Sequence, residues 1–477
     1  MRSRAGKWAC AGAGSVMVVL GLSALSAQES GQPKTFLPKE VDTGQSYSPV
    51  VLEEDFETIY QRESANKDEV MAQQKKLLES RYDLSDNPSE VWMSAKRKKV
   101  QQGIRVKMSE GMTWQKLSQM SPDQIRQQNA FPMGFRPLPH ARHAEGGMVF
   151  APKQIEAIQK AEHRDLQRFD VDFDLPDHLL PEFPPPVFLT THPELGDVSQ
   201  GQVLTIRNIH ELFMGKVTPF QLEGLRLLVT AFPQQQFNAT HDRKVKEPST
   251  GVTCFDCHVN GHTNGTFHLN PDTRPQKARF RIETPSLRGM FQQQIHGSKR
   301  ALRSVEDFTE FEQRTAYFDG DPVTAAKKGI NVLDRGTSVS AMAQFQIILD
   351  FPPAPKLDVL GRLDPDKASE LEMKGQEVFF NKGRCGECHP SPHYLDNLMH
   401  DLKVGRFYEP QLISDHWDRQ AGPMKTTTLR GIKDSPPYLH DGRLLTLEDT
   451  VEFFDIVLQT RLSEEEKKAL VAFMRCL

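Results

Sequence analysis

Hydrophobic positions along this chain recur mostly at helical spacing, and few segments alternate as strands do. Helical stretches are expected at 53–82, within 88–128, and in the apolar segments Met342–Leu349 and Ala469–Leu477. Proline-rich breaks interrupt them at 132–139, 181–186 and Phe351–Asp358. Strand signals are weak and short, so the pattern predicts a mainly α fold.

The first residues show a different pattern. A basic start is followed by the apolar run Val16–Leu22 and the small residues Ser23–Ala27, which predicts that 1–28 is a secretory signal. The run is too short to span a bilayer as a mature helix, although an uncleaved anchor is the alternative. We therefore expect export to the periplasm.

Two CxxCH motifs carry the chemistry of the chain, Cys254–His258 and Cys385–His389. This motif is typical of covalent c-type haem attachment, with Cys254, Cys257, Cys385 and Cys388 forming thioethers. His258 and His389 would then be the proximal iron ligands. The motifs use four of six cysteines, which leaves little thiol for a disulfide framework. Part of a zinc or redox site is the alternative interpretation.

The sequence around the motifs is repeated. Thr284–Gly289 (TPSLRG) recurs as Thr426–Gly431 (TTTLRG), and the acidic helix starts at Ser304 and Thr446 keep the same spacing of 142 residues. Ser304 and Thr446 are expected to be N-caps. The repetition predicts an internal duplication of one helical unit.

The chain therefore divides into four parts. After the signal come a partly irregular N-terminal region at 29–200, a first cytochrome c-like haem domain at 201–350 and a second at 359–477. Lys and Arg total 59 against 63 Asp and Glu, and nothing in this balance indicates nucleic acid.

The duplicated CxxCH unit, with TxxLRG, Pro437–Gly442 (PYLHDG) and TLEDTVEF, resembles the bacterial di-haem cytochrome c peroxidase family, which includes MauG-like enzymes. The resemblance covers about 200–477. It implies two haem c groups, hydrogen peroxide reacting at one haem, and electrons arriving at the other from a small donor such as a cytochrome c or copper protein. It also implies a homodimer and calcium between the domains, although no EF-hand-like spacing is present.

The chain departs from this family at two positions. The family's inter-haem tryptophan falls on Ser298, and the distal ligand of the second haem, about fourteen residues after His440, falls on Phe454. Phenylalanine cannot bind iron. Either the second iron is open or another residue serves, and the candidates are Met399, His400, Met424 and Met474.

Other side chains are candidates for proton transfer or haem binding. For the first haem, His268 is the preferred distal or acid–base group, with His262 and His296 as alternatives. Acidic candidates after the first helix start are Glu306, Glu310, Glu312 and Gln313. Arg288 and Arg430 occupy matching places in the two copies and are expected to pair with haem propionates.

Three functions remain open from the sequence. The first is an exported di-haem oxidoreductase that uses hydrogen peroxide. The second is a MauG-like oxidase acting on a protein or organic substrate, which the missing tryptophan and methionine favour. The third is a non-enzymatic di-haem electron carrier.

Overall fold

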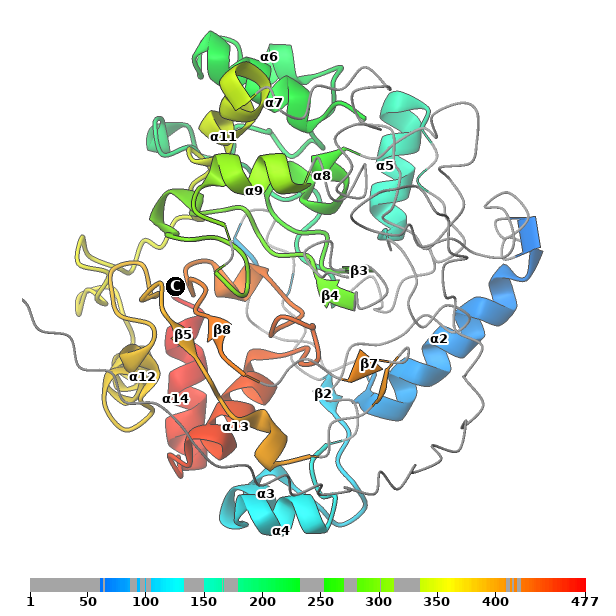
Figure 1. The fold of residues 1–477 in the computed structure, drawn as a ribbon. Helices are drawn as coiled ribbons and strands as arrows, with labels where there is room; N and C mark the ends of the chain where they lie inside the picture. The colour runs from blue at the N-terminus through cyan, green and yellow to red at the C-terminus, as the bar shows by residue number, and fades with distance from the viewer. Residues whose placement is uncertain are drawn as a thin grey trace, which may run out of the picture. The chain divides into compact units, whose positions relative to one another are not determined.

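Helices carry most of the secondary structure in this computed structural model (Figure 1). The structure describes residues 61–62, 65–85, 92–94, 99, 104–132, 150–164, 166, 179–231, 253–269, 281–300, 302–312, 335–408, 412–413, 416–417 and 422–477. The expected signal at 1–28 and Gln313 lie outside these residues. Within them, the prediction of a mainly α fold is confirmed. No helix of the described part is both long and apolar enough to cross a bilayer.

The helices are α2 (Lys67–Arg81), α3 (Trp114–Gln119), α4 (Pro122–Gln127), α5 (Pro152–Glu162), α6 (Ile209–Phe213), α7 (Pro219–Leu228), α8 (Cys254–Cys257), α9 (Val305–Glu312), α11 (Ser340–Gln346), α12 (Glu370–Phe380), α13 (Leu447–Leu458) and α14 (Glu464–Met474). The strands form antiparallel pairs, β1 (Tyr82–Asp83) with β2 (Arg105–Val106), β3 (Phe267–Leu269) with β4 (Arg281–Glu283), β5 (Met399–His400) with β8 (Met424–Lys425), and β6 (Leu412–Ile413) with β7 (His416–Trp417).

Side-chain caps fix where the main helices begin. Ser369 and Ser463 form capping boxes at the starts of α12 and α14, which satisfy backbone N–H groups that a helix leaves unpaired. Ser304 Oγ accepts from the backbone N–H of Asp307, and Thr446 Oγ1 accepts from that of Asp449, both at 3.1 Å. The predicted N-caps at Ser304 and Thr446 are therefore confirmed.

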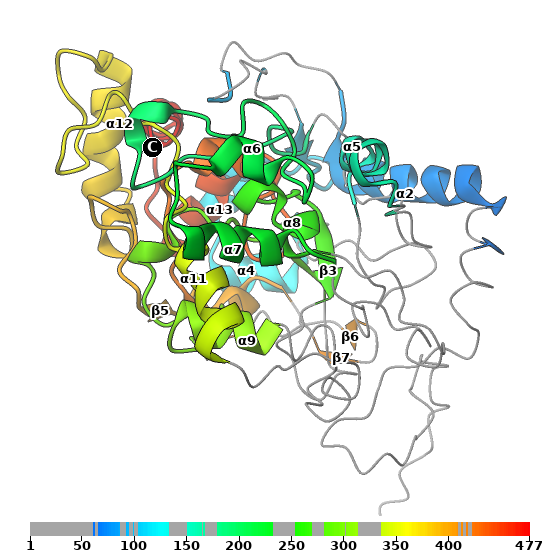
Figure 2. The same cartoon turned by 90° about the horizontal axis from the view of Figure 1, so that it is seen from above.

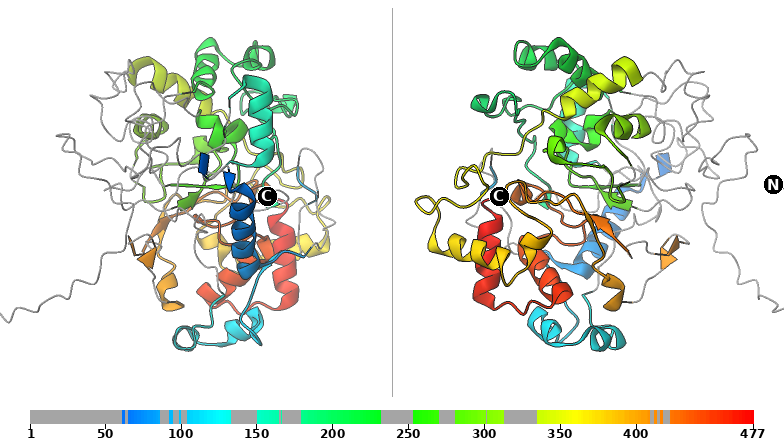
Figure 3. Two further views of the ribbon diagram at one scale, coloured as in Figure 1. Left: turned by 90° about the vertical axis from the view of Figure 1, so that its right-hand side faces the viewer. Right: turned by 60° about the vertical axis from the view of Figure 1, so that its left-hand side comes forward.

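Two helix pairs cross at glycines. In Figure 2, α7 lies beside α11, and a Cβ on Gly224 would lie 1.9 Å from the carbonyl oxygen of Ala341. Figure 3 shows α12 and α14, where a Cβ on Gly375 would lie 1.9 Å from the carbonyl oxygen of Ala469. Only glycine lets the backbones approach this closely. Both helix crossings therefore depend on a glycine at the point of contact.

The 142-residue spacing seen in the sequence also appears in the backbone. Gly289 and Gly431 both have positive φ, 76° and 73°, and each precedes a short 3₁₀ turn. Isolated antiparallel bridges join His296 to Leu302 and Tyr438 to Leu444 at the same relative positions. Corresponding segments of the two copies thus adopt corresponding conformations.

The described hydrophobic residues form two cores. One draws on positions between Val187 and Leu349, with Phe213 and Phe345 packed edge to face at 5.8 Å. The other combines residues from Leu78 to Leu180 with residues from Leu363 to Leu477. The N-terminal segment therefore shares a core with the second half of the chain.

Polar contacts anchor the same segment. The Tyr82 hydroxyl donates to the carbonyl of Arg443 at 2.6 Å, and the guanidinium of Arg105 pairs with the buried carboxylate of Asp449. The backbone N–H of Val106 donates to Asp449 as well, at 2.9 Å. In Figure 1, α3 lies next to α13, in agreement with their contacts.

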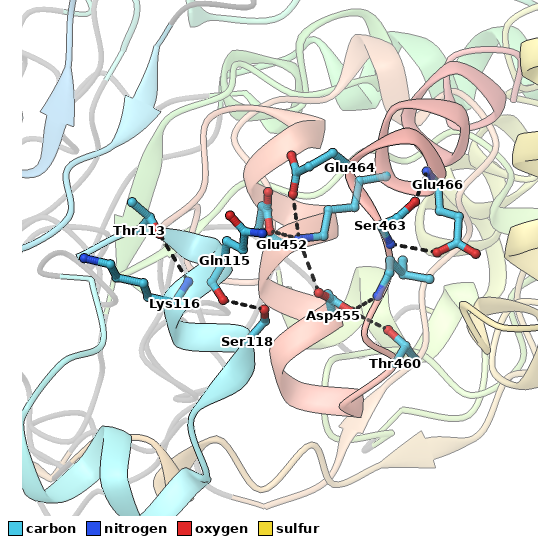
Figure 4. A network of polar contacts seen from close by, with 12 residues as sticks. Thr113, Gln115, Lys116, Ser118, Glu452, Asp455, Thr460, Ser463, Glu464 and Glu466 are labelled. Carbon is cyan, nitrogen blue, oxygen red and sulfur yellow. Dashed lines mark hydrogen bonds and ion pairs between the residues drawn. The ribbon is translucent and has the colours of Figure 1, made fainter. Parts of the chain in front are cut away.

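An ion cluster ties α13 to α14. The carboxylates of Glu452, Asp455 and Glu464 converge in Figure 4, and each lies within 3.4 Å of the buried Nζ of Lys467. Desolvation by burial lowers the pKa of this ammonium and the carboxylates raise it, with a net upward shift. The cluster keeps Lys467 charged in a protein interior and fixes the helix pair.

Candidate haem sites

The first CxxCH motif forms one turn of helix, α8, so Cys254 and Cys257 lie three residues apart on one face. Asp256 fixes this turn, because its carboxylate accepts from the backbone N–H of Thr253 at 2.7 Å. The same buried carboxylate accepts two hydrogen bonds from Arg164, at 2.9 and 3.0 Å. Residues just after α5 therefore clamp the motif, a contact that the sequence did not indicate.

The second motif follows α12 directly. Cys385–Glu387 forms a 3₁₀ turn, and the N–H of His389 donates to the carbonyl of Cys385 at 2.9 Å. Arg384, in the left-handed region at φ 57°, pairs with Glu387 at 2.8 Å on the surface. The motif thus occupies a sharp turn directly after a long helix.

Both motif histidines are oriented in the same way. Nδ1 of His258 donates to the carbonyl of Pro285, and Nδ1 of His389 donates to the carbonyl of Tyr394, each at 2.8 Å. A carbonyl can only accept, so Nδ1 of each ring carries a hydrogen. This orientation by a backbone carbonyl is how proteins prepare a histidine to bind a metal.

Burial determines the state of the other motif side chains. It lowers the pKa of His389, raises the pKa of Cys257 well above its ordinary range, and raises that of Cys385 to about 12. Burial also raises the pKa of Cys388. None of the described cysteines forms a disulfide.

Among the described residues, one group has metal-ligand chemistry, Cys388, Asp396 and His400. Nε2 of His400 lies 2.6 Å from the Asp396 carboxylate, so this ring nitrogen is already paired. The group includes Cys388 and lacks the other cysteine of the motif, Cys385. It therefore does not bring the CxxC pair together in one metal site.

The two expected propionate partners differ in their contacts. Arg288 is buried and donates from Nη2 to the carbonyl of Pro186 at 2.6 Å, while its Nε and Nη1 have no hydrogen-bond partner. Asp434 lies 3.8 Å from that Nη1. Arg430 donates to the carbonyls of Leu477 and Pro352. The buried Nε and Nη1 donors of Arg288 could therefore pair with a carboxylate such as a haem propionate.

The candidate distal ligands of the second haem lie in different places. Met399 and His400 form β5 and face Met424 and Lys425 of β8 across the pair. Met474 is buried in α14. Phe454, at the position where the family has a ligand, packs edge to face on Phe453 at 5.2 Å.

Of the histidines near the first motif, His262 is the most constrained. It is buried, and both of its ring nitrogens have partners, Ser286 Oγ at 2.8 Å and the carbonyl of Asp434 at 3.0 Å. His296 is buried beside Leu302. His268 belongs to β3, where its backbone faces Ile282, and its side chain lies outside the described part.

The acidic candidates lie along α9. Glu306 is in its first turn and half-buried, Glu310 is buried, and Glu312 is its last residue. The sequence reasoning missed Glu283, the last residue of β4, whose carboxylate accepts from the Thr263 hydroxyl at 3.0 Å. Burial raises the pKa of Glu283 well above its ordinary range, which lets it keep a proton. Its position directly before the repeated TxxLRG turn was the available signal.

Ser298, where the family's tryptophan is expected, lies against the second half of the chain. Its carbonyl accepts from the backbone N–H of Lys425 at 2.9 Å. Trp417, a tryptophan of the second half, is described only by its backbone in β7. The contact at Ser298 is therefore made by the main chain.

The two CxxCH motifs and the carbonyl-bound motif histidines fit a c-type haem protein. No family model matches the chain. Curated relatives include cytochrome c551 peroxidase of Nitrosomonas europaea, 30% identical over 187 residues, which cover 37% of this chain and 52% of the relative. MauG, the methylamine utilization protein of Methylorubrum extorquens, is 27% identical over 157 residues, 29% of this chain and 43% of the relative. The cytochrome-c peroxidase IdrP2 of Denitromonas iodatirespirans is 26% identical over 153 residues, which cover 24% of this chain and 41% of the relative.

The chain is thus similar to cytochrome c peroxidases and to MauG, in agreement with the resemblance of its motifs. It spans about half the length of the curated relatives it matches. Among solved structures, hydrazine synthase of Kuenenia stuttgartiensis is 20% identical, with 58% of this chain and 93% of that chain covered and a TM-score of 0.36. A MauG-like protein associated with microbial copper homeostasis is 17% identical, with 54% of this chain and 87% of that chain covered and a TM-score of 0.35.

Proposed function

We propose that this chain is an exported di-haem c-type oxidoreductase that reduces hydrogen peroxide at one haem and receives electrons through the other. The observation that carries the proposal is the matched pair of motif histidines, His258 and His389, each of which has its Nδ1 held by a backbone carbonyl at 2.8 Å. The electrons would come from a small redox protein, a cytochrome c or a copper protein. A homodimer and a calcium ion between the domains belong to the same proposal by resemblance.

The proposed architecture has two repeated haem units at 201–350 and 359–477. The repeated glycine crossings at Gly224 and Gly375 and the common 142-residue spacing support it. Residues 29–200 would act as a wrap on these units. Arg164 bonded to Asp256 and Arg105 paired with Asp449 support this part, because each contact ties the N-terminal region to one of the units.

Haem iron supplies peroxide binding and electron exchange when it is present. Reduction of one hydrogen peroxide to two waters consumes two electrons and two protons. The chain's own residues would orient the proximal ligands through Pro285 and Tyr394, pair a propionate with Arg288, and hold a proton near the first motif. Glu283 fits the last role best, ahead of Glu306, Glu312, Gln313 and His268. Burial raises its pKa, and its carboxyl group is hydrogen-bonded to the loop that follows His258.

The haem assignment is tested by counting covalent haems. The purified protein should carry two haem c per chain in a pyridine haemochrome assay. Cys257→Ser and Cys388→Ser should each remove one haem, because each deletes one thioether. Cys476→Ser is the matched control, since Cys476 is also a buried free thiol but lies outside both motifs. Retention of both haems in either motif variant contradicts the assignment.

The reaction is tested separately on the two-haem protein. Rapid mixing with hydrogen peroxide should change the Soret spectrum within milliseconds to seconds, and a reduced donor protein should then be oxidised at two equivalents per peroxide. An unchanged spectrum and an unreacted donor would leave only the electron-carrier function.

One observation favours the second candidate, a MauG-like oxidase acting on a protein or organic substrate. Phe454, at the position of the family's distal ligand, is packed on Phe453 and offers no ligand atom. Peroxide consumption without oxidation of any small redox protein, together with covalent change of another substrate, would support this candidate.

A further inference from the structure

A chain of hydrogen bonds leads from the first motif histidine to the second half of the protein. His258 Nδ1 donates to the carbonyl of Pro285 at 2.8 Å, and the next residue is Ser286. Ser286 Oγ lies 2.8 Å from His262 Nδ1. His262 Nε2 lies 3.0 Å from the carbonyl of Asp434, a residue 172 positions away in the second half. Each link is a covalent segment or a hydrogen bond of ordinary length.

The direction of each bond follows from the groups involved. The Asp434 carbonyl can only accept, so Nε2 of His262 carries the hydrogen. Nδ1 then accepts from the hydroxyl of Ser286. Burial, followed by the charge of Arg288, lowers the pKa of His262 well below its ordinary value, which agrees with a neutral ring. His262 is therefore a fixed neutral imidazole with one donor and one acceptor contact.

The chain continues from Asp434 to the second motif histidine. The N–H of Asp434 donates to the carbonyl of Gly431 at 3.0 Å, and the backbone leads from Gly431 through Arg430 to Leu429. The N–H of Leu429 donates to the carbonyl of Tyr394 at 3.3 Å. That same carbonyl accepts from Nδ1 of His389 at 2.8 Å. Both expected proximal ligands are thus ends of one connected route.

We infer that this route, with the His262 imidazole as its crossing point between the halves, carries electrons from the second haem to the first. Electronic coupling decays more slowly through bonds and hydrogen bonds than across a gap. The inference rests on the proposed di-haem function. With haem bound at both motifs, each transfer would pass one electron from the haem held at His389 to the oxidised haem held at His258, and the small redox donor would replace that electron. Two transfers and two protons turn one hydrogen peroxide into two waters.

Other contacts also join the two halves, and they supply the control. Lys299 Nζ donates to the carbonyl of Pro423 at 2.7 Å, which is a side-chain-to-carbonyl contact across the halves like that of His262. Lys299 is not a member of the route. Lys299→Met therefore removes an inter-half hydrogen bond and leaves the route intact.

The experiment measures electron transfer between the haems after photochemical reduction of the two-haem protein, followed in the Soret band of each haem. His262→Leu removes the ring and should slow the transfer by about tenfold or more, with haem content, circular dichroism and reduction potentials unchanged. Ser286→Ala removes only the hydroxyl donor to Nδ1 and should slow it about two- to fivefold. Lys299→Met should match the wild type within about twofold.

Ser286→Ala also keeps the test decisive if His262→Leu fails to fold, because it deletes one hydroxyl at a half-buried position. The double variant should be no slower than His262→Leu alone, since both changes break one route. A wild-type transfer rate in His262→Leu or in Ser286→Ala, with both haems attached, overturns the inference, and so does the absence of any transfer in the wild type.

The outcome separates the inference from the proposed function. A protein that ignores peroxide, yet loses inter-haem transfer in His262→Leu, keeps the route and loses the peroxidase proposal. A protein that consumes peroxide, and transfers electrons between the haems equally fast with or without the His262 ring, keeps the function and loses the route.

Discussion

At the residue scale, His262 shows how burial sets a protonation state. In the unfolded chain its imidazole takes up a proton near pH 6.5, whereas in the folded protein burial holds its pKa well below this value. Below pH 6.5 the unfolded state therefore binds more protons than the folded state. The free energy of unfolding falls as the pH decreases from this point towards the folded-state pKa.

His262→Gln should therefore lose less stability than the wild type between pH 7 and pH 5, because glutamine takes up no proton in either state. Chemical denaturation at pH 7, 6 and 5 measures this difference. His210→Gln, at an exposed histidine on α6, is the control and should keep the wild-type pH slope. An identical slope in His262→Gln and the wild type would contradict the assignment of a buried neutral ring.

Glu283 is the second residue whose state matters. As the proposed proton holder, it should be required for the peroxide reaction and not for haem attachment. Glu283→Gln should keep two haems and slow the reaction with peroxide by about tenfold or more. Glu306→Gln and Glu312→Gln, changes to half-buried acids on α9, are the comparison, and rapid mixing with peroxide measures all three. A larger loss in either α9 variant would transfer the role to that acid.

Sequence reasoning identified the residues that carry the covalent chemistry, because CxxCH is a local pattern. It could not identify Glu283, whose pKa depends on burial by residues far away in the chain. It also could not show that Ser286 and Asp434 both contact His262, since these contacts depend on tertiary packing. The caps at Ser304 and Thr446 were predictable because capping involves residues only three apart.

At the scale of elements, the crossing of α12 and α14 depends on the missing side chain of Gly375. Alanine favours a helix over glycine by up to about 1 kcal/mol. A Cβ at this position, however, would lie 1.9 Å from a backbone oxygen, so the helices would have to separate. Overpacking of this kind costs about 1–3 kcal/mol, and the steric cost should exceed the gain in propensity.

Gly375→Ala and Gly224→Ala should therefore both lower the free energy of unfolding, by about 1–2 kcal/mol after the helix propensity is included. Denaturant titration checks the value. Gly405→Ala is the control, because a Cβ there would meet no atom within 4 Å and its φ is not positive. Stabilisation by Gly375→Ala would show that the helices separate at no cost.

The repeated TxxLRG turns and acidic helix starts were visible in the sequence. The partner of each helix was not, because a helix shows its apolar face and not the helix that covers it. The packing of α3 on α13 was hidden for the same reason.

At the scale of the whole molecule, the N-terminal region completes the second core. Leu78, Ile104, Leu117 and Ile125 are buried in the same cluster as Phe379 and Phe453. Removal of these residues would expose apolar surface of the second core to water, at a cost in folding free energy of about 25 cal/mol per Å². The family resemblance of the sequence covers only about 200–477. It therefore could not show that the second core depends on the N-terminal region.

A chain that begins at residue 201 should therefore be less stable than one that begins at residue 29, and it should tend to aggregate. A milder test is Arg105→Met, which leaves the buried carboxylate of Asp449 without its cation. Since Arg105 is partly exposed, we expect a loss of about 2–3 kcal/mol, below the range for a fully buried pair. Lys116→Met, at an exposed lysine of α3, is the control. Equal stability of the long and short chains would refute the dependence.

The two cores differ in how far apart their residues lie along the chain. All residues of the first core lie within one stretch of sequence, between Val187 and Leu349. The other core joins residues near Leu78 to residues as far along the chain as Leu477. Contacts between distant segments form slowly, because a long loop must close first. The first core needs no residue beyond Leu349, so it can assemble before the C-terminal helices dock. We therefore expect Cys254 and Cys257 to reach their native positions before Cys385 and Cys388.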